Sequence, residues 1–281
     1  MGAARSSLKA AAATTDLVRH SPGGTTILIY HRVGAGSGGQ MDIEPSRFEE
    51  QLAWLSTNAE VISLDEALLR LGSRSISAQG VAPAGNTGHG SRPEVVITFD
   101  DGTTDWVDHV LPALERHRLP ATFYVATSFI EERTALPGEG RPVSWAGLSE
   151  MSGSDLVTIG AHTHRHMLLD RLAESEIADE LDRCSELLAE NTGQRPDHFA
   201  YPKAVAGSAE AENAVRQRYR SAVLAGTRAN LPGVDPYRLA RSPIQASDDG
   251  LWFRLKAKGG MRFEDDFRQL ANRLRYRKLT S

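Results

Sequence analysis

Residues 94–102 read "EVVITFDDG", an apolar run followed by two adjacent aspartates and a glycine. The run predicts a buried strand, and Asp100 and Asp101 come where that strand ends. Three more predicted strands also end in polar clusters, in "ILIYHR" (27–32), "TIGAHTHRH" (158–166) and "HFAYPK" (198–203). In folds built on a parallel sheet, reactive groups collect where the strands end, because the loops there converge on one face. This coincidence is the main functional signal of the sequence.

Predicted helices separate these strands. Phe48, Leu52 and Leu55 recur at helical spacing after the first strand, and Ile177, Leu181, Cys184 and Leu188 do so after the histidine cluster. Alternation of strand and helix indicates the α/β class, with a mainly parallel sheet and crossover helices. The pattern alone leaves open an open doubly wound sheet or a barrel.

Composition bounds the class of protein. The chain has 281 residues, a net charge of -4 and a single cysteine, so it has the composition of an ordinary soluble protein without an intramolecular disulfide. A charge of this sign argues against sequence-independent binding of nucleic acid over the whole surface. The sequence holds no apolar run of about 18 residues, which excludes a transmembrane helix. Without a clear export signal either, we expect a cytoplasmic protein.

One catalytic domain is expected over residues 25–281, after an N-terminal extension at 1–24. Residues 72–94, rich in Gly, Ser, Ala and Pro, predict a flexible surface insertion within that domain. The basic amphipathic stretch at 267–279 is typical either of an ordinary terminal helix or of peripheral contact with an anionic membrane, and the first is favoured.

The two aspartates and the histidine cluster together make a candidate metal site. Asp100 and Asp101 leave the strand in different directions, so one can bind a metal while the other acts as a base; a plain Asp-Asp-Gly turn is the alternative. His162 and His166 are four residues apart, close enough for both imidazoles to reach one ion. With Asp101 they give two histidines and one carboxylate, a set that leaves coordination positions open for water and substrate.

An open metal site of this kind indicates hydrolysis. A divalent ion lowers the pKa of bound water toward about 7 and polarises a carbonyl, while a nearby carboxylate takes up the proton of the attacking water. Hydrolysis of an amide also needs a proton donor for the departing amine, and a histidine across the site suits that role.

The motifs "TFDDG" (98–102), "HTHRH" (162–166) and "FAYP" (199–202) resemble, in this order and at these separations, the first three motifs of the polysaccharide deacetylases, the NodB-homology or carbohydrate esterase family 4 proteins. The resemblance covers residues 25–245. It implies an irregular (β/α)7 barrel and removal of an acetyl group, usually from N-acetylglucosamine units. It also implies a divalent metal, most often Zn²⁺, with Co²⁺ or Ni²⁺ as alternatives.

Carried over position by position, the resemblance makes Asp100 the catalytic base. Tyr201 falls where the family offers a backbone N–H to the developing oxyanion. His164 falls at a variable position and is not assigned as a ligand. The implied metal ligands are Asp101, His162 and His166.

Two positions depart from the common family pattern. The third motif usually has an arginine that supports the base, but this chain has Ala200 and Lys203 around its Tyr-Pro pair. Arg241 is the candidate replacement and Arg238 the second choice. Many relatives also place the acid histidine near the C-terminus, whereas no histidine follows His198 here.

The missing C-terminal histidine points back to the first strand. A circularly permuted branch of the family, which includes the poly-N-acetylglucosamine deacetylases, begins with a strand ending in Tyr-His. The stretch "ILIYHRVG" (27–34) resembles that pattern, so His31 is assigned as the general acid. A histidine that only forms hydrogen bonds at the tip of a strand is the alternative.

The favoured function is therefore metal-dependent removal of N-acetyl groups from an amino sugar in a polysaccharide or glycoconjugate. Two alternatives stay open. One is hydrolysis of acetyl esters or small non-sugar amides on the same fold and metal. The other is a glycan-binding protein that keeps the barrel without turnover. The altered third motif favours this alternative, and the intact set of Asp100, Asp101, His162 and His166 argues against it.

Overall fold

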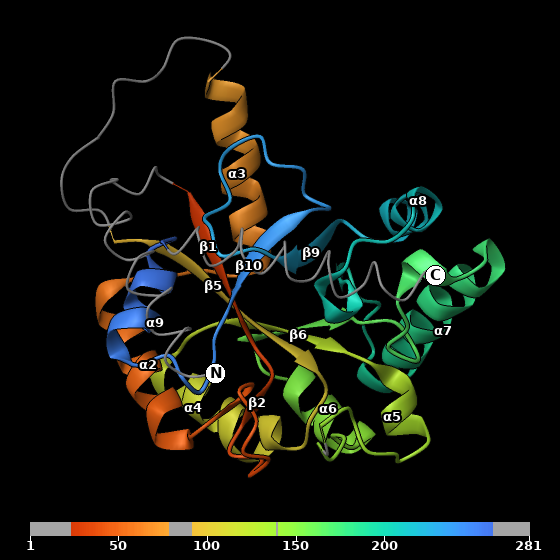
Figure 1. The fold of residues 1–281 in the computed structure, drawn as a ribbon, viewed down its shortest axis with the longest axis horizontal. Coiled ribbons are helices and arrows are strands. Elements are labelled where there is room, and N and C mark those ends of the chain that lie inside the picture. The colour runs from red at the N-terminus through yellow and green to blue at the C-terminus, as the bar shows by residue number, and fades with distance from the viewer. Residues whose placement is uncertain (1–23, 79–91, 139, 261–281) are drawn as a thin grey trace, which may run out of the picture.

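A computed structural model describes residues 24–78, 92–138 and 140–260 of the chain. Among these residues, seven parallel strands close into a barrel (Figure 1). In order around it they are β1 (Thr25–Tyr30), β5 (Glu94–Asp101), β6 (Ala121–Val125), β7 (Val157–Ala161), β8 (His198–Ala200), β9 (Ser221–Ala225) and β10 (Leu239–Pro243). The barrel closes because β1 pairs on one edge with β5, Tyr30 opposite Phe99, and on the other with β10, Ile27 opposite Arg241. The barrel predicted from the motifs is thereby confirmed.

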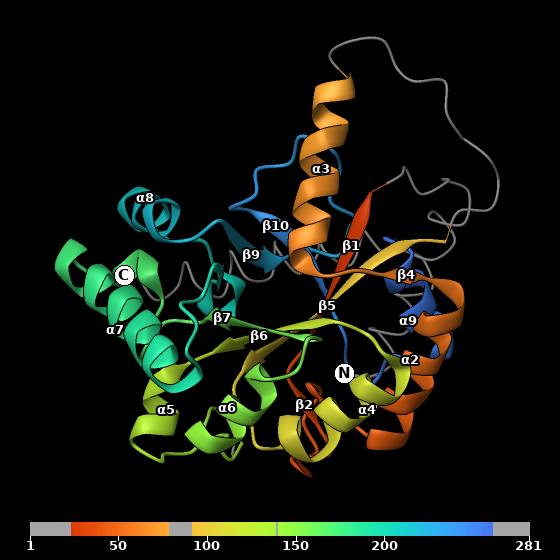
Figure 2. The ribbon, with the colours of Figure 1, turned by 180° about the vertical axis from the view of Figure 1, so that it is seen from behind.

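Helices surround the barrel. The longer ones are α2 (Pro45–Asn58), α3 (Leu64–Ala78), α4 (Leu111–His117), α6 (Trp145–Ser152), α7 (Glu174–Thr192), α8 (Ala209–Arg218) and α9 (Gly250–Ala257). From both sides of the molecule, α2, α4 and α9 gather on one flank of the barrel and α5 (Thr127–Glu131), α6 and α7 on the other (Figures 1 and 2). A short pair of strands, β2 (Arg32–Val33) and β3 (Asp42–Ile43), lies beyond the end of β1, and β4 (Glu60–Val61) joins the edge of β5. The single-turn segments are η1 (Trp106–Val110), η2 (Leu169–Arg171) and η3 (Pro202–Ala204).

Successive side chains of β5 point alternately toward the surrounding helices and into the barrel. Val95, Ile97 and Phe99 belong to the main hydrophobic core, which lies between the strands and the surrounding helices. Val96 points the other way and packs with inward residues of the other strands and with the first turns of α3. Thr98 and Asp100 share the inward face with Val96, so the inner column ends in a carboxylate at the carboxyl end of the strand.

The predicted insertion at 72–94 is only partly irregular in the structure. Helix α3 continues through Ala78 and β5 begins at Glu94, so residues 72–78 of the predicted insertion are helical. Residues 79–91, the predicted N-terminal extension up to residue 23 and the basic stretch at 267–279 lie outside the described residues. Within the described ranges, no helix is both long and apolar enough to cross a membrane.

Candidate metal centre and active site

The backbone at the end of β5 turns both aspartates toward the same place. Strand alternation alone would point Asp101 away from the inward Asp100. Asp101 instead has a φ of 89° and Gly102 a φ of 108°, so the chain twists sharply at the end of the strand. A non-glycine residue in this region is strained, and such strain is concentrated at functional sites. Both carboxylates are buried, Asp100 to 3% and Asp101 to 7% residual exposure.

Asp101 meets the two predicted histidine ligands. One of its carboxylate oxygens, Oδ1, lies 3.6 Å from His162 Nε2 and 3.6 Å from His166 Nε2. One ligand atom from each of the three residues lies within 4.8 Å of the others. The histidine cluster is a loop after β7 rather than a helical turn, and the left-handed backbone of Thr163 and His166, with φ of 63° and 56°, folds it compactly enough for both imidazoles to meet Asp101.

These three residues fit a divalent transition metal. Two ligands about 2.0–2.1 Å from a tetrahedral zinc ion lie about 3.3 Å apart, close to the separations found here. His162 Nδ1 donates a hydrogen bond to the Ala200 carbonyl oxygen at 2.7 Å, so Nε2, the ring nitrogen on the side of Asp101, is the one left to bind a metal. A backbone acceptor that fixes the tautomer in this way is typical of metal-binding histidines.

The electrostatics of the metal-free cluster favour an ionised Asp101 and a neutral His166, whereas the charges of Asp100 and Asp101 outweigh burial and raise the pKa of His162. Burial would raise the pKa of Asp101, but a hydrogen bond from His162 and the charges of His31 and His166 outweigh it and hold that pKa well below its usual range. Burial and the neighbouring charge of His162 lower the pKa of His166 to about 4. At neutral pH Asp101 is therefore ionised and His166 is neutral.

Arg241, the predicted partner of Asp100, contacts it directly. The side chain of Arg241 is fully buried in the barrel and donates two hydrogen bonds to Asp100, from Nη1 to Oδ1 at 2.6 Å and from Nη2 to Oδ2 at 2.7 Å. Burial raises the pKa of Asp100, but the charges of Arg241 and His162 lower it by more than burial raises it, so the net shift is downward. The second choice, Arg238, pairs with Glu212 on the surface.

His31 lies beside the two carboxylates. Because Tyr30 pairs with Phe99 across β1 and β5, the next residues along, His31 and Asp100, emerge at the same level. Burial lowers the pKa of His31, while the charges of Asp101 and Asp100 oppose that shift. The Trp106 indole N–H donates to the His31 carbonyl oxygen at 2.9 Å and fixes the backbone there.

The Tyr201 amide, the predicted oxyanion donor, already has a hydrogen-bond partner in the sheet. The Tyr201 N–H donates to the Val223 carbonyl oxygen at 3.2 Å, so the β8–β9 pairing already uses it. Two residues further on, the N–H of Lys203 has no hydrogen-bond partner within the described part of the chain. The oxyanion contact expected at Tyr201 thus falls on an amide that the sheet already uses.

Arg32 has a role that sequence reasoning missed. Its guanidinium is buried and donates to the carbonyl oxygens of Pro137 and Gly138, at 2.8 Å for Gly138. Next to it, the Val33 N–H donates to Asp105 Oδ2 at 2.7 Å. Arg32 therefore ties the loop before α6 to the strand that delivers His31. An arginine directly after the histidine in "YHRV" was the only signal of this tether.

His164 faces away from the metal cluster, as expected for a residue that is not a ligand. Its Nδ1 lies 3.0 Å from Thr127 Oγ1, and its Nε2 lies 3.7 Å from Glu131 Oε2. The side chain thus links the histidine loop to α5.

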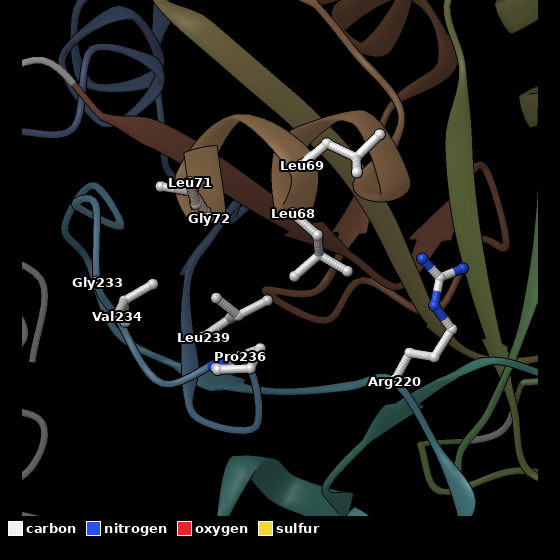
Figure 3. Close-up of a pocket in the computed structure, with 9 residues that line it drawn as sticks. All are labelled: Leu68, Leu69, Leu71, Gly72, Arg220, Gly233, Val234, Pro236 and Leu239. Atoms are coloured by element: carbon white, nitrogen blue, oxygen red, sulfur yellow. The ribbon is translucent and has the colours of Figure 1, made fainter. Parts of the chain in front are cut away.

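A separate apolar groove of about 470 Å³ lies at the other end of the barrel (Figure 3). It is bounded by Leu68 and Leu69 of α3, by Arg220 and Leu239 at the amino ends of β9 and β10, and by Val234 and Pro236 of the loop between them. Among the described residues its lining has no carboxylate or imidazole, whereas the candidate metal ligands lie at the carboxyl ends of the strands.

Comparison with known proteins shows which family the chain resembles. A family model described as polysaccharide deacetylase matches residues 87–222. The chain is 26% identical over 182 residues to the putative polysaccharide deacetylase YxkH of Bacillus subtilis, covering 64% of this chain and 57% of that protein. It is 24% identical over 233 residues to a poly-beta-1,6-N-acetyl-D-glucosamine N-deacetylase of Staphylococcus aureus, covering 80% of this chain and 74% of that one.

Among solved structures, IcaB from Ammonifex degensii superposes with a TM-score of 0.69 at 23% identity, covering 85% of this chain and 97% of that one. The family model thus places a polysaccharide deacetylase domain within residues 87–222, and the family resemblance predicted from the motifs is confirmed. The chain spans little more than half of YxkH, and 27% and 40% of the next two curated relatives.

Proposed function

We propose that this protein is a metal-dependent hydrolase that removes the acetyl group from an N-acetylated amino sugar in a polysaccharide or glycoconjugate. One observation carries the proposal. A buried carboxylate held by Arg241, Asp100, lies beside the three-residue cluster of Asp101, His162 and His166. A site that only binds a metal or a glycan needs no second, ionised carboxylate at that position.

Each residue has a defined part in this reaction. A divalent ion bound by Asp101, His162 and His166 would polarise the acetyl carbonyl and lower the pKa of bound water. Asp100, whose pKa is lowered by Arg241, accepts the proton of the attacking water and is kept in place by its two hydrogen bonds. His31 protonates the departing amine from the neighbouring strand. The partnerless Lys203 N–H is the candidate donor to the oxyanion.

Zinc is the proposed metal, because two imidazoles and one carboxylate with open positions suit a catalytic zinc ion. Cobalt and nickel bind similar donor sets. The family model and the Staphylococcus aureus relative support a sugar substrate, and the polar cluster at the carboxyl ends of the strands supports hydrolysis there.

Acetate release tests the proposal. The protein is stripped with a chelator, reloaded with Zn²⁺, Co²⁺ or Ni²⁺, and incubated with N-acetylated sugars and oligosaccharides. We expect release only with metal, and loss of release in Asp100→Asn protein that still binds one equivalent of zinc. Metal-loaded, folded protein that releases no acetate from any of these substrates would overturn the proposal in favour of a glycan-binding role.

A further inference from the structure

Lys203 is a charged residue at the mouth of the site. The proposed reaction uses its backbone N–H but gives its side chain no part. It lies in η3, directly after β8, whose last carbonyl, that of Ala200, accepts the hydrogen bond from His162. Lys203 and Ala204 both have left-handed backbone, with φ of 53° and 55°, so the chain turns back on itself there. The Lys203 side chain is exposed and has no hydrogen bond or ion pair with any described residue.

Acidic residues near the histidine loop are already engaged and do not neutralise this lysine. Glu180 accepts hydrogen bonds from the backbone N–H and the guanidinium of Arg165. Glu131 pairs with Arg183 and faces His164.

The charge of the metal-loaded site makes a free lysine there significant. Arg241 and a divalent ion together outweigh the charges of Asp100 and Asp101, so the loaded site is positive before Lys203 is counted. Lys203 is close enough for its charge to lower the pKa of His166. A further ammonium at the mouth repels the bound cation unless an anion lies between or beside them.

We propose that Lys203 binds an anionic group of the substrate, so that the preferred substrate is an acidic N-acetylated amino sugar with a carboxylate or phosphate near the acetyl group that is removed. This inference rests on the proposed deacetylase function and narrows it to a substrate class. A lysine acts on such a group as a point charge, which suits a carboxylate or a phosphate alike. Lys203 is thus assigned as a specificity-determining residue.

A second role for the ammonium predicts a different result. If Lys203 stabilised the oxyanion of the reaction instead, its loss would slow neutral and anionic substrates by the same factor and would act on kcat. An anion-binding role acts on the ratio between the substrates, and mainly through KM.

The experiment compares kcat and KM of zinc-loaded protein for three substrates. These are a neutral N-acetylglucosamine oligomer, an oligomer with N-acetylmuramic acid for the carboxylate, and N-acetylglucosamine 1-phosphate for the phosphate. Variants are Lys203→Met, Lys203→Arg and, as a matched cation at the opposite end of β5, the exposed Arg92→Met. Each is measured in low salt and in about 0.5 M salt.

We expect the wild type to prefer one anionic substrate, and Lys203→Met to reduce that preference about fivefold in low salt. Lys203→Arg should retain the preference, Arg92→Met should leave it unchanged, and salt should weaken it in the wild type. The carboxylate and phosphate arms identify which group is bound. An equal loss on neutral and anionic substrates, or a wild type that prefers the neutral one, would overturn the inference.

A binding titration separates this inference from the proposed function. Metal-free wild-type and Lys203→Met proteins are titrated with the same neutral and anionic sugars, so no turnover is required. Weaker binding of the anionic sugar alone in Lys203→Met supports the lysine contact even if no acetate is released. Equal affinities of the two proteins for every sugar refute it even if deacetylation is confirmed.

Discussion

Arg241 on β10 and Asp100 at the end of β5 form a fully buried ion pair in which each carboxylate oxygen accepts one guanidinium hydrogen bond, at 2.6 and 2.7 Å. Nη1 of the arginine also donates to Thr98 Oγ1 at 3.1 Å. This two-point contact sets both the direction and the ionisation of Asp100. The pair joins residues 141 positions apart, across strands that meet only because the barrel is closed through β1.

Replacing the arginine should therefore affect catalysis through the base. In Arg241→Lys the two-point contact is lost, so the ionised carboxylate is stabilised less, the pKa of Asp100 rises and the acid limb of kcat/KM moves to higher pH. Activity at neutral pH should fall at least about tenfold. The check is a pH–rate profile beside that of Arg238→Lys, whose parent arginine pairs with Glu212 on the surface. An unshifted acid limb would contradict the assigned role of Arg241.

Removal of single imidazoles should distinguish the two histidine ligands from His164, which lies between them in the sequence. His162→Ala and His166→Ala each delete a donor of the three-residue cluster, so zinc affinity should fall at least about a hundredfold. His164→Ala is the control because that imidazole faces Thr127 and Glu131. Competition with a chelating dye measures the affinity, and equal loss in all three variants would reject the assigned ligand set.

The stability of the metal-free protein should depend on pH through His166. Burial and the charge of His162 lower its pKa from the usual 6.5 to about 4 in the folded chain. Between these values the unfolded chain binds a proton that the folded chain does not, so the stabilisation is present above pH 6.5 and is lost as the pH falls to 4. The loss amounts to about 3 kcal/mol.

Urea unfolding of the metal-free protein from pH 7 to pH 4 tests this dependence. His166→Gln should show a shallower decline than the wild type, because glutamine has no proton to gain. Wild-type and variant curves that run parallel over this window would show that the imidazole is not buried in the neutral form.

Local sequence signals predicted the fold class and most of the candidate site for a physical reason. Apolar runs that end in Asp100, His162 and His31 are strands whose ends must meet at one face of a parallel barrel, so residues far apart in sequence were correctly grouped. Arg241 could only be preferred over Arg238 as the partner of Asp100. The exact start of β10 decides which of the two arginines points into the barrel, and the sequence does not specify that start.

The features that were not predicted depend on which hydrogen-bond partner an individual backbone group has in the folded chain. Tyr201 was assigned an oxyanion contact, yet its N–H is used by the pairing of β8 with β9, a fact fixed by register rather than by residue type. The Arg32 tether depends on the path of a loop about 105 residues later in the chain. Neither leaves a pattern in the sequence, because any residue has an N–H and a carbonyl oxygen to offer.

The general-acid role of His31 should be visible as a difference between leaving groups. An amine leaves only when protonated, whereas the alcohol of an acetyl ester leaves more readily without help. His31→Ala should therefore lose amide cleavage by about a hundredfold or more and ester cleavage by much less. Matched substrates, an N-acetylated sugar and an O-acetylated one, measure the two losses on the same protein preparation.

His31→Gln keeps polar bulk at the strand tip and controls for collapse of the site around Asp100. A loss confined to the amide substrate in both variants would support proton donation to the amine. Equal losses on amide and ester would show that His31 positions the substrate or the carboxylates instead. Amide activity that survives in both variants would reject the acid role, and the donor would then have to be sought among the other groups at the mouth of the barrel.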